Sequence, residues 1–117
     1  MNITKTIRSF RHAFAGMYHA LQNHQNLKVH IAAAVFTTII TIFLDIPKVE
    51  FLMVVFAIMF VIFAEMVNTS IEEMTDLITQ EHRQEAKIAK DIASAAVLIA
   101  SIFAIVVALV VFVPRLF

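Results

Sequence analysis

Three long apolar runs constrain this chain more than any other feature: Val29 to Leu44, Phe51 to Ala64 and Ile92 to Val113. At about 1.5 Å per residue the third run covers about 33 Å, close to the roughly 30 Å hydrocarbon core of a bilayer. The first two runs are shorter and can span only with flanking residues or local thinning. We therefore predict one all-α membrane domain, residues 1–117, with transmembrane helices at 29–47, 49–67 and 91–113. The second is expected to continue into a cytoplasmic helix end at 68–80.

The composition agrees with a chain covered by lipid. Of 117 residues, 61% are hydrophobic and only 15% are charged. A soluble domain of this size has too little interior to bury so much apolar surface. One glycine and two prolines argue against a turn-rich β fold, and the lack of cysteine excludes disulfides and thiol nucleophiles. The formal net charge of zero offers no bulk attraction to nucleic acid, which we exclude as a partner.

The basic residues lie mostly on one side of the predicted spans. Seven of them precede the first run or separate the second from the third, whereas Lys48 and Arg115 are alone on the opposite side. The positive-inside rule then places the amino terminus and the second connection in the cytoplasm. We expect a multi-pass protein of the plasma membrane with a cytoplasmic amino terminus.

Two further patterns concern packing. In the segment 1–27, apolar residues recur at steps of four and three, which predicts an amphipathic helix in the headgroup layer. A helix that packs on its own protein would give the same pattern, and the two interpretations are compatible. The apolar positions of this arm are Ile3, Ile7, Phe10, Phe14, Met17 and Leu21. The third span has an alanine at every fourth position from Ala96 to Ala108, which favours close helix packing.

A polar stripe follows the second apolar run without any loop signal. Glu65, Asn68, Glu72 and Asp76 step by three and four residues, so they share one face of a helix. Acids on one face repel, and a charge at the position of Glu65 is costly beside lipid. A Mg²⁺ ion that arrives with nucleotide phosphates would balance them, because it prefers one or two carboxylates plus phosphate oxygens. With Gly16 as the only glycine, the chain has no glycine-rich phosphate loop.

A second polar group, at the cytoplasmic start of the third span, is the expected partner of this stripe. It consists of Lys87, Lys90, Asp91 and Ser94. Phosphoryl transfer needs positioning, charge stabilisation and a base for the acceptor hydroxyl, and Glu65 is the best candidate for that base. The residues alone leave alternatives open. Glu65 could be a structural acid paired with Lys90, the acidic face could bind a transported cation, and the lysines could be membrane anchors.

The motif Glu65-x-x-Asn68-x-x-x-Glu72-x-x-x-Asp76, followed by Ala89-Lys90-Asp91-x-x-Ser94, resembles the prokaryotic diacylglycerol kinase family. That family includes glycerolipid kinases and undecaprenol kinases. The resemblance implies a bacterial membrane homotrimer with active sites shared between subunits, which uses ATP and Mg²⁺ to phosphorylate a lipid hydroxyl. By position, Glu65 corresponds to the catalytic base, Glu72 to the metal carboxylate beside the nucleotide, and Asn68 and Asp76 to active-site polar residues. Nucleotide contacts are implied for Glu81, His82, Arg83, Lys90 and Asp91, and a lipid contact for Ser94.

The chain departs from the family pattern at His24, where a second metal-binding glutamate is expected. Imidazole is a poor ligand for Mg²⁺, which prefers oxygen, so His24→Glu is predicted to raise the rate with Mg·ATP. The stretch Glu81-His82-Arg83 also differs from the usual Glu-Tyr-His of the family. The stretches Asp76-Leu77-Ile78-Thr79 and Asn26-Leu27-Lys28-Val29-His30 resemble the undecaprenol kinase branch more closely. This resemblance implies undecaprenol as acceptor, with diacylglycerol as the alternative. A non-enzymatic membrane scaffold is the alternative from another class; an ion pathway is disfavoured, because the third span has only Ser101 in its middle.

Overall fold

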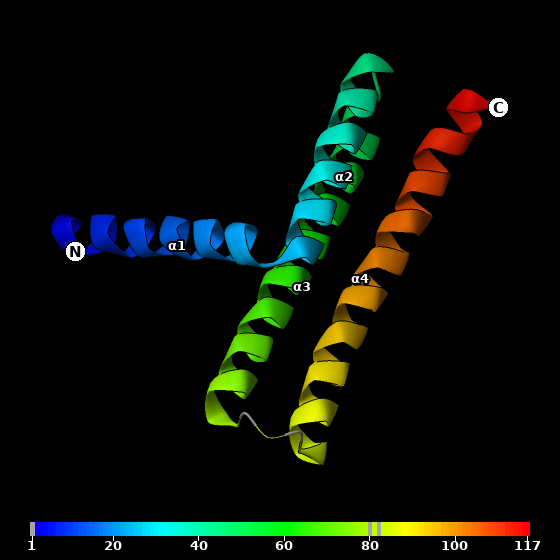
Figure 1. Ribbon diagram of the computed structural model, residues 1–117. Coiled ribbons are helices and arrows are strands. Elements are labelled where there is room, and N and C mark those ends of the chain that lie inside the picture. Colours follow the sequence, from blue (N-terminus) through cyan, green and yellow to red (C-terminus); the bar gives the residue numbers. More distant parts are fainter. Residues whose placement is uncertain (1, 80, 82) are drawn as a thin grey trace.

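The computed structural model describes residues 2–79, 81 and 83–117, and all regular structure in them is helical. The four helices are α1 (Ile3–Asn23), α2 (Gln25–Phe43), α3 (Lys48–Ile78) and α4 (Gln84–Leu116). Figure 1 shows α2, α3 and α4 along a common direction, with α1 projecting from them at a large angle. The last three helices are long and apolar enough to cross a membrane. The all-α class and the three spanning helices are therefore confirmed.

The boundary between the arm and the first span differs from the expected one. His24 has an extended backbone (φ −124°, ψ 112°), so the chain turns there and residues 25–27 belong to α2 rather than to the arm. At its other end α2 stops at Phe43, four residues before the expected 47. The reason is the reversal that follows: Asp45 has a left-handed φ of 53°, and Pro47 cannot continue a helix.

The other two spanning helices, α3 and α4, both extend beyond their expected transmembrane segments. α3 contains both 49–67 and the predicted helix end as one uninterrupted helix of 31 residues. At about 1.5 Å per residue it is about 46 Å long, more than the roughly 30 Å of hydrocarbon, so its polar end from Asn68 lies outside the span. α4 begins at Gln84, before the expected 91, and passes Pro114 to end at Leu116. A proline so near the helix end removes only one backbone hydrogen bond.

Packing within the chain centres on α3, which contacts both α2 and α4. Ala100 is completely buried against Val61 and Ala64, with Ala104 beside them. The middle of the alanine stripe thus packs between α3 and α4, as predicted, whereas Ala96 is exposed. A second cluster around Val54 and four other residues lies nearer the opposite ends of these helices. The two clusters hold α3 and α4 together along the length of the spans.

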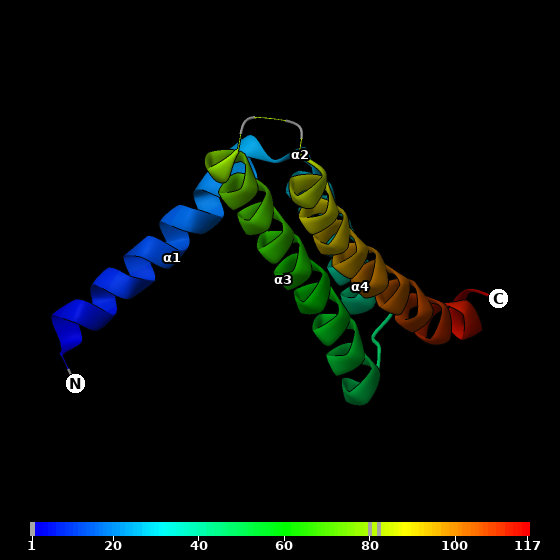
Figure 2. The ribbon, with the colours of Figure 1, turned by 90° about the horizontal axis from the view of Figure 1, so that it is seen from below.

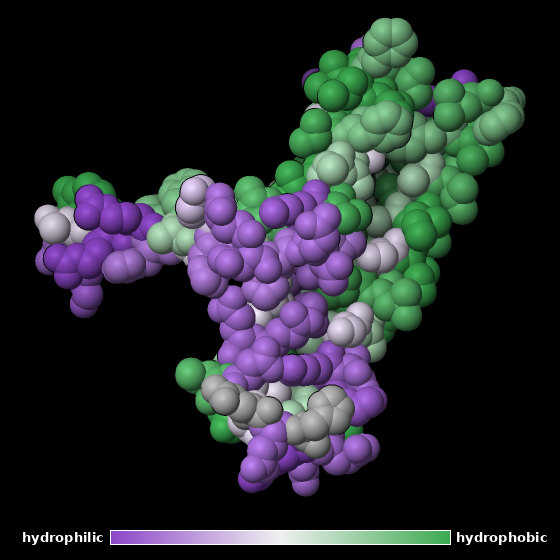
Figure 3. All heavy atoms as spheres, in the orientation of Figure 1, coloured by the Kyte–Doolittle hydropathy of each residue, from purple (hydrophilic) through white to green (hydrophobic). Residues whose placement is uncertain are grey.

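The arm meets the other helices only near its carboxyl end. Ala20 is its one buried residue in the part of the chain that is described, and contacts run from α1 to α2 and α3. The apolar stripe from Ile3 to Leu21 is exposed, so it is available to a membrane surface rather than packed on the protein. Figure 2 shows the arm leading away from the other three helices, and Figure 3 shows hydrophilic surface gathered at one end of the apolar helices.

Candidate functional site

The inner part of the site is built around Glu65. This carboxylate lies on the α3 face that packs against α2, with a side chain only 3% exposed. Its Oε2 atom is 3.5 Å from Nε2 of His30, a residue near the start of α2. The alternative in which Glu65 pairs with Lys90 is wrong, because Nζ of Lys90 donates instead to Oδ1 of Asp76 at 2.5 Å. The buried acid therefore faces a histidine, not a lysine.

His30 is a contact that sequence reasoning missed, although the sequence contains a signal for it. α2 and α3 form an antiparallel hairpin whose turn lies near Asp45 and Ile46. Residues at similar distances on either side of such a turn lie at the same depth, and His30 and Glu65 satisfy that condition. A histidine inside an apolar run, level with an acid, is therefore a candidate partner of that acid.

Asn68 and Glu72 form the next layer toward the carboxyl end of α3. Nδ2 of Asn68 donates to Oε1 of Glu72 at 3.1 Å, which confirms that these two positions of the stripe share a face. Asn68 and Thr69 are buried, yet Oδ1 of Asn68 and Oγ1 of Thr69 have no hydrogen-bond partner among the described residues. Buried polar atoms are nearly always satisfied, so these two oxygen atoms are exceptions among the described residues.

The outer part of the site is a polar cavity of about 390 Å³ where α3 ends and α4 begins. Three acidic and three basic residues contribute to its lining: Asp76, Glu81, Asp91, Arg83, Lys87 and Lys90. Besides the bond between Lys90 and Asp76, Nζ of Lys87 donates to Oδ2 of Asp91 at 2.7 Å. The cations are thus held by acids of the same cavity, and an anionic ligand must compete with those acids.

The remaining predicted residues are spread around this cavity or lie beyond it. Glu81 is exposed and accepts a hydrogen bond from Nε of Arg83 at 3.4 Å. Ser94 is exposed on α4, one turn after Lys90. His82 lies outside the described residues. The structure therefore brings together Asp76, Glu81, Arg83, Lys90 and Asp91 around one cavity, with Glu65, Asn68 and Glu72 on the adjoining inner face.

A histidine pair at the base of the arm was not foreseen. Nε2 of His19 and Nε2 of His24 both lie 2.9 Å from Oε1 of Glu73, and each imidazole N–H donates to that oxygen. Hydrogen bonds from His24 and then His19 hold the pKa of the exposed Glu73 carboxyl below its usual value. Glu73 thus ties α3 to the residue that occupies the expected position of a metal-binding glutamate.

The polar face and the alanine stripe are buried only in part within one chain. Within one chain Glu65, Asn68 and Ala100 are buried, whereas Asp76 and Ala96 are exposed. The homotrimer remains a prediction that rests on the family resemblance.

Comparison with known proteins agrees with the motif. A family model described as prokaryotic diacylglycerol kinase matches residues 11–112. Undecaprenol kinase from Bacillus subtilis is 31% identical over 97% of this chain and 93% of its own length. Diacylglycerol kinase from Escherichia coli (strain K12) is 29% identical, over 88% of this chain and 84% of its own. A diacylglycerol kinase from Synechocystis sp. is 33% identical, but the match covers 57% of its length. The chain belongs to the prokaryotic diacylglycerol kinase family, whose named members are lipid kinases.

Proposed function

We propose that this protein transfers the γ-phosphoryl group of ATP to the hydroxyl group of a membrane lipid alcohol. The observation that carries the proposal is the position of Glu65, a buried carboxylate within a spanning helix, on the α3 face that leads through Asn68 and Glu72 to a polar cavity lined by Lys87 and Lys90. A lipid hydroxyl reaches this depth from the membrane, whereas nucleotide phosphates reach the cavity from water. The site therefore lies where the two substrates can meet.

Glu65 is the base in this proposal. Its carboxylate takes the proton of the acceptor hydroxyl while the hydroxyl oxygen forms a bond to the γ-phosphorus, and the bond from phosphorus to the ADP oxygen breaks. His30 lies against the same carboxylate and orients it. Lys90 stabilises phosphate charge as a point charge once it has exchanged Asp76 for the nucleotide. The cost of that exchange is small, because the Asp76 side chain is exposed.

The inner face suits Mg²⁺ bound together with nucleotide. Glu72 offers a carboxylate, and Asn68, whose amide nitrogen donates to that carboxylate, lies one helical turn away on the same face. Within the described ranges no three acidic or histidine side chains form a metal-binding group. Mg²⁺ is usually held by one or two carboxylates plus substrate phosphates, so Glu72 and Asn68 fit this mode. When bound, the ion would neutralise charge on the β- and γ-phosphates.

We propose undecaprenol as the acceptor, with diacylglycerol as the second candidate. The Bacillus subtilis relative named undecaprenol kinase aligns with nearly the full length of both chains, which supports the first. The Escherichia coli and Synechocystis relatives are named diacylglycerol kinases and support the second. The proposed setting is a bacterial plasma membrane with the amino terminus in the cytoplasm, and a homotrimer. A scaffold without activity remains the alternative function, favoured by His24 in place of a glutamate.

A competition assay separates these functions. Purified protein in vesicles that contain equal amounts of undecaprenol and diacylglycerol would be given labelled Mg·ATP, and the products identified by mass spectrometry. We expect undecaprenyl phosphate to form at least about tenfold faster than phosphatidic acid, a preference that modest differences in lipid contacts can supply. Preferential labelling of diacylglycerol would reverse the choice of acceptor. Labelling of neither lipid would favour the scaffold.

The contact between His24 and Glu73 changes what we expect of His24→Glu. The single substitution places a second carboxylate at the 2.9 Å contact with Glu73, and like charges at that distance repel. The exchange His24→Glu with Glu73→His keeps an acid and a histidine facing each other, and it puts a carboxylate at the expected ligand position. We predict that the exchange lowers the Mg²⁺ concentration for half-maximal rate by roughly tenfold, since ligand charge tunes metal affinity.

The matched control for this exchange is Glu73→His alone, which leaves three histidines together and no carboxylate among them. It should not lower the Mg²⁺ requirement. Titration of initial rate against Mg²⁺ at fixed ATP measures the effect for each variant. An exchanged protein with the same Mg²⁺ requirement as the wild type would show that residue 24 does not contact the metal.

A further inference from the structure

The proton that Glu65 takes from a lipid hydroxyl must leave this carboxyl group before the next turnover. The Glu65 side chain is only 3% exposed, so its carboxylate is almost closed off from water. One turn along α3, the side chain of Asn68 is an amide, which is not a base, and its nitrogen donates to Glu72. A proton on Glu65 therefore needs a basic side chain that touches the carboxylate and also reaches water.

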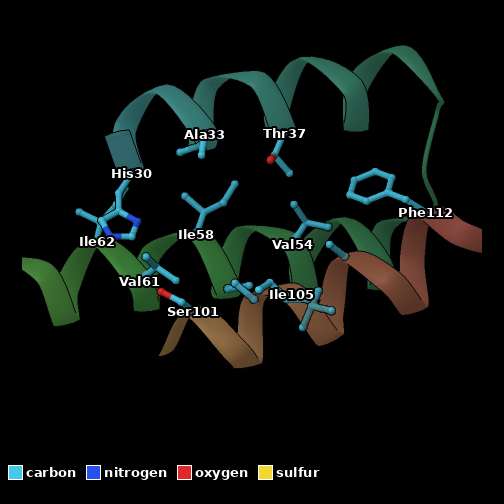
Figure 4. Close-up of a pocket in the computed structure, with 15 residues that line it drawn as sticks. His30, Ala33, Thr37, Val54, Ile58, Val61, Ile62, Ser101, Ile105 and Phe112 are labelled. Atoms are coloured by element: carbon cyan, nitrogen blue, oxygen red, sulfur yellow. The ribbon is translucent and has the colours of Figure 1, made fainter. Parts of the chain in front are cut away.

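His30 is a described side chain that meets both conditions. Its Nε2 atom lies 3.5 Å from Oε2 of Glu65, and its side chain is 23% exposed. Histidine is also the side chain that most readily takes up and releases a proton near neutral pH. Figure 4 shows the imidazole ring at one end of the cavity between the spanning helices, directed from α2 toward α3. The ring is therefore placed between the buried acid and the start of α2.

The surroundings of His30 leave one direction in which a proton can go. The cavity beside it has a volume of about 240 Å³. Among the described residues that line this cavity, His30 is the only titratable one, and α4 contributes Ser101 as its only polar side chain. Asn26 lies one turn before His30 on the same face of α2, and it is exposed. That face leads to the end of the helices that carries the hydrophilic surface in Figure 3.

The distance between His30 and Glu65 suits a pair that shares no proton at rest. At Glu73, the imidazole nitrogens of His19 and His24 lie 2.9 Å from the carboxylate oxygen, within the roughly 2.7–3.2 Å of an N–H···O hydrogen bond. The 3.5 Å between His30 and Glu65 is longer, as expected when an ionised carboxylate faces an unprotonated nitrogen. A proton on Glu65 would turn this contact into an O–H···N hydrogen bond, and such contacts shorten during turnover.

We propose that His30 takes the proton from Glu65 after each phosphoryl transfer and releases a proton to water. The inference rests on the proposed lipid kinase function. As the lipid oxygen bonds to phosphorus, its O–H bond breaks and the proton goes to Glu65. The O–H bond of Glu65 then breaks while Nε2 of His30 gains that proton, and Nδ1 loses its own proton to water. Exchange with water returns the remaining proton to Nδ1 before the next turnover.

The number of turnovers separates a proton relay from a purely orienting role. His30→Gln keeps an N–H group that can donate to Glu65, but an amide is not a base. The full-length protein, in vesicles with undecaprenol and diacylglycerol, would be mixed with labelled Mg·ATP and quenched after milliseconds to minutes. We expect the first turnover, about one lipid per chain, to keep its rate within about threefold of wild type. Later turnovers should be slower by about 10- to 100-fold, because each needs Glu65 to lose its proton first.

Two further variants complete the test. His12→Gln is the same substitution at an exposed position of α1, and it should leave the first and later turnovers as in the wild type. His30→Ala leaves space beside Glu65 for imidazole from solution, which should raise the rate of later turnovers by roughly fivefold or more. Pyrazole has nearly the same shape as imidazole but is a far weaker base, so it should restore nothing.

The outcomes distinguish the relay from the kinase function itself. Equal losses in the first and later turnovers of His30→Gln would assign His30 an orienting role only and overturn the relay. Equal rescue of His30→Ala by imidazole and pyrazole would overturn it as well. Wild-type rates throughout in His30→Gln would show that the proton leaves by another route, with the kinase function intact. A wild-type protein that phosphorylates neither lipid would refute the kinase function and the relay together.

Discussion

Glu65→Gln is expected to reduce lipid phosphorylation by a factor of about 10² to 10⁴, the contribution of a positioned general base. The amide has nearly the same shape as the carboxylate, so the buried position between α2 and α3 remains filled and contact with His30 is kept. What is lost is the ability to accept the proton of the lipid hydroxyl. Initial rates with labelled Mg·ATP in lipid vesicles measure the effect, and circular dichroism with thermal unfolding checks that the helices remain.

Glu50→Gln is the matched control for this substitution. Glu50 is the acid at the opposite end of α3, half-buried and paired with Arg115. Its loss removes an ion pair between α3 and α4 far from the polar cavity where α3 ends and α4 begins, so stability should decrease while kcat stays within about threefold of wild type. If Glu65→Gln kept a tenth or more of the wild-type rate, another residue would have to be the base. If the wild type itself were inactive, the result would favour the non-enzymatic scaffold.

The fold was largely predictable because the patterns that determine it are local. Apolar runs such as Ile92 to Val113 predict spanning helices by their length and composition alone. The step of three and four from Glu65 to Glu72 fixes a common helix face whatever surrounds it, and the hydrogen bond from Asn68 to Glu72 agrees with that face. The helix break at His24 was harder to predict from the sequence, because residues 25–27 have no strong preference between the arm and the span.

The partners of the site residues were not predictable in the same way. Which side chain faces Glu65 depends on how α2 is rotated about its axis, and tertiary packing sets that rotation. The same holds for Glu73, an exposed residue of α3. Its contacts with His19 and His24 depend on how the arm meets α3. Lys90 is a third case, since its choice of Asp76 depends on how α3 and α4 meet. Periodicity defines a face, but it does not identify what the face meets.

These contacts describe a site with its charges balanced before any substrate arrives. Lys90 is held by Asp76, Lys87 by Asp91, and Glu73 by two histidines. Glu72 differs, because its described side-chain bond is to the neutral amide of Asn68. Its carboxylate charge has no cation to balance it among those contacts. An incoming Mg²⁺ ion would therefore be expected to bind Glu72 before any other acid of the stripe.

Glu72→Gln should accordingly lower the rate with Mg·ATP by a factor of about 10² or more, because metal stabilisation of phosphoryl charge is worth several kcal/mol. The Mg²⁺ concentration for half-maximal rate should rise as well, since an amide oxygen is a weaker ligand than a carboxylate. The neighbouring Glu73→Gln removes the same charge one residue away, from a carboxylate that is bonded to the arm. Loss of such an exposed contact should change the rate by no more than about fivefold. Rates measured against Mg²⁺ at fixed ATP for both variants distinguish the two acids. If the two substitutions had equal effects, or if Glu72→Gln left the Mg²⁺ requirement unchanged, Glu72 would not be the metal carboxylate.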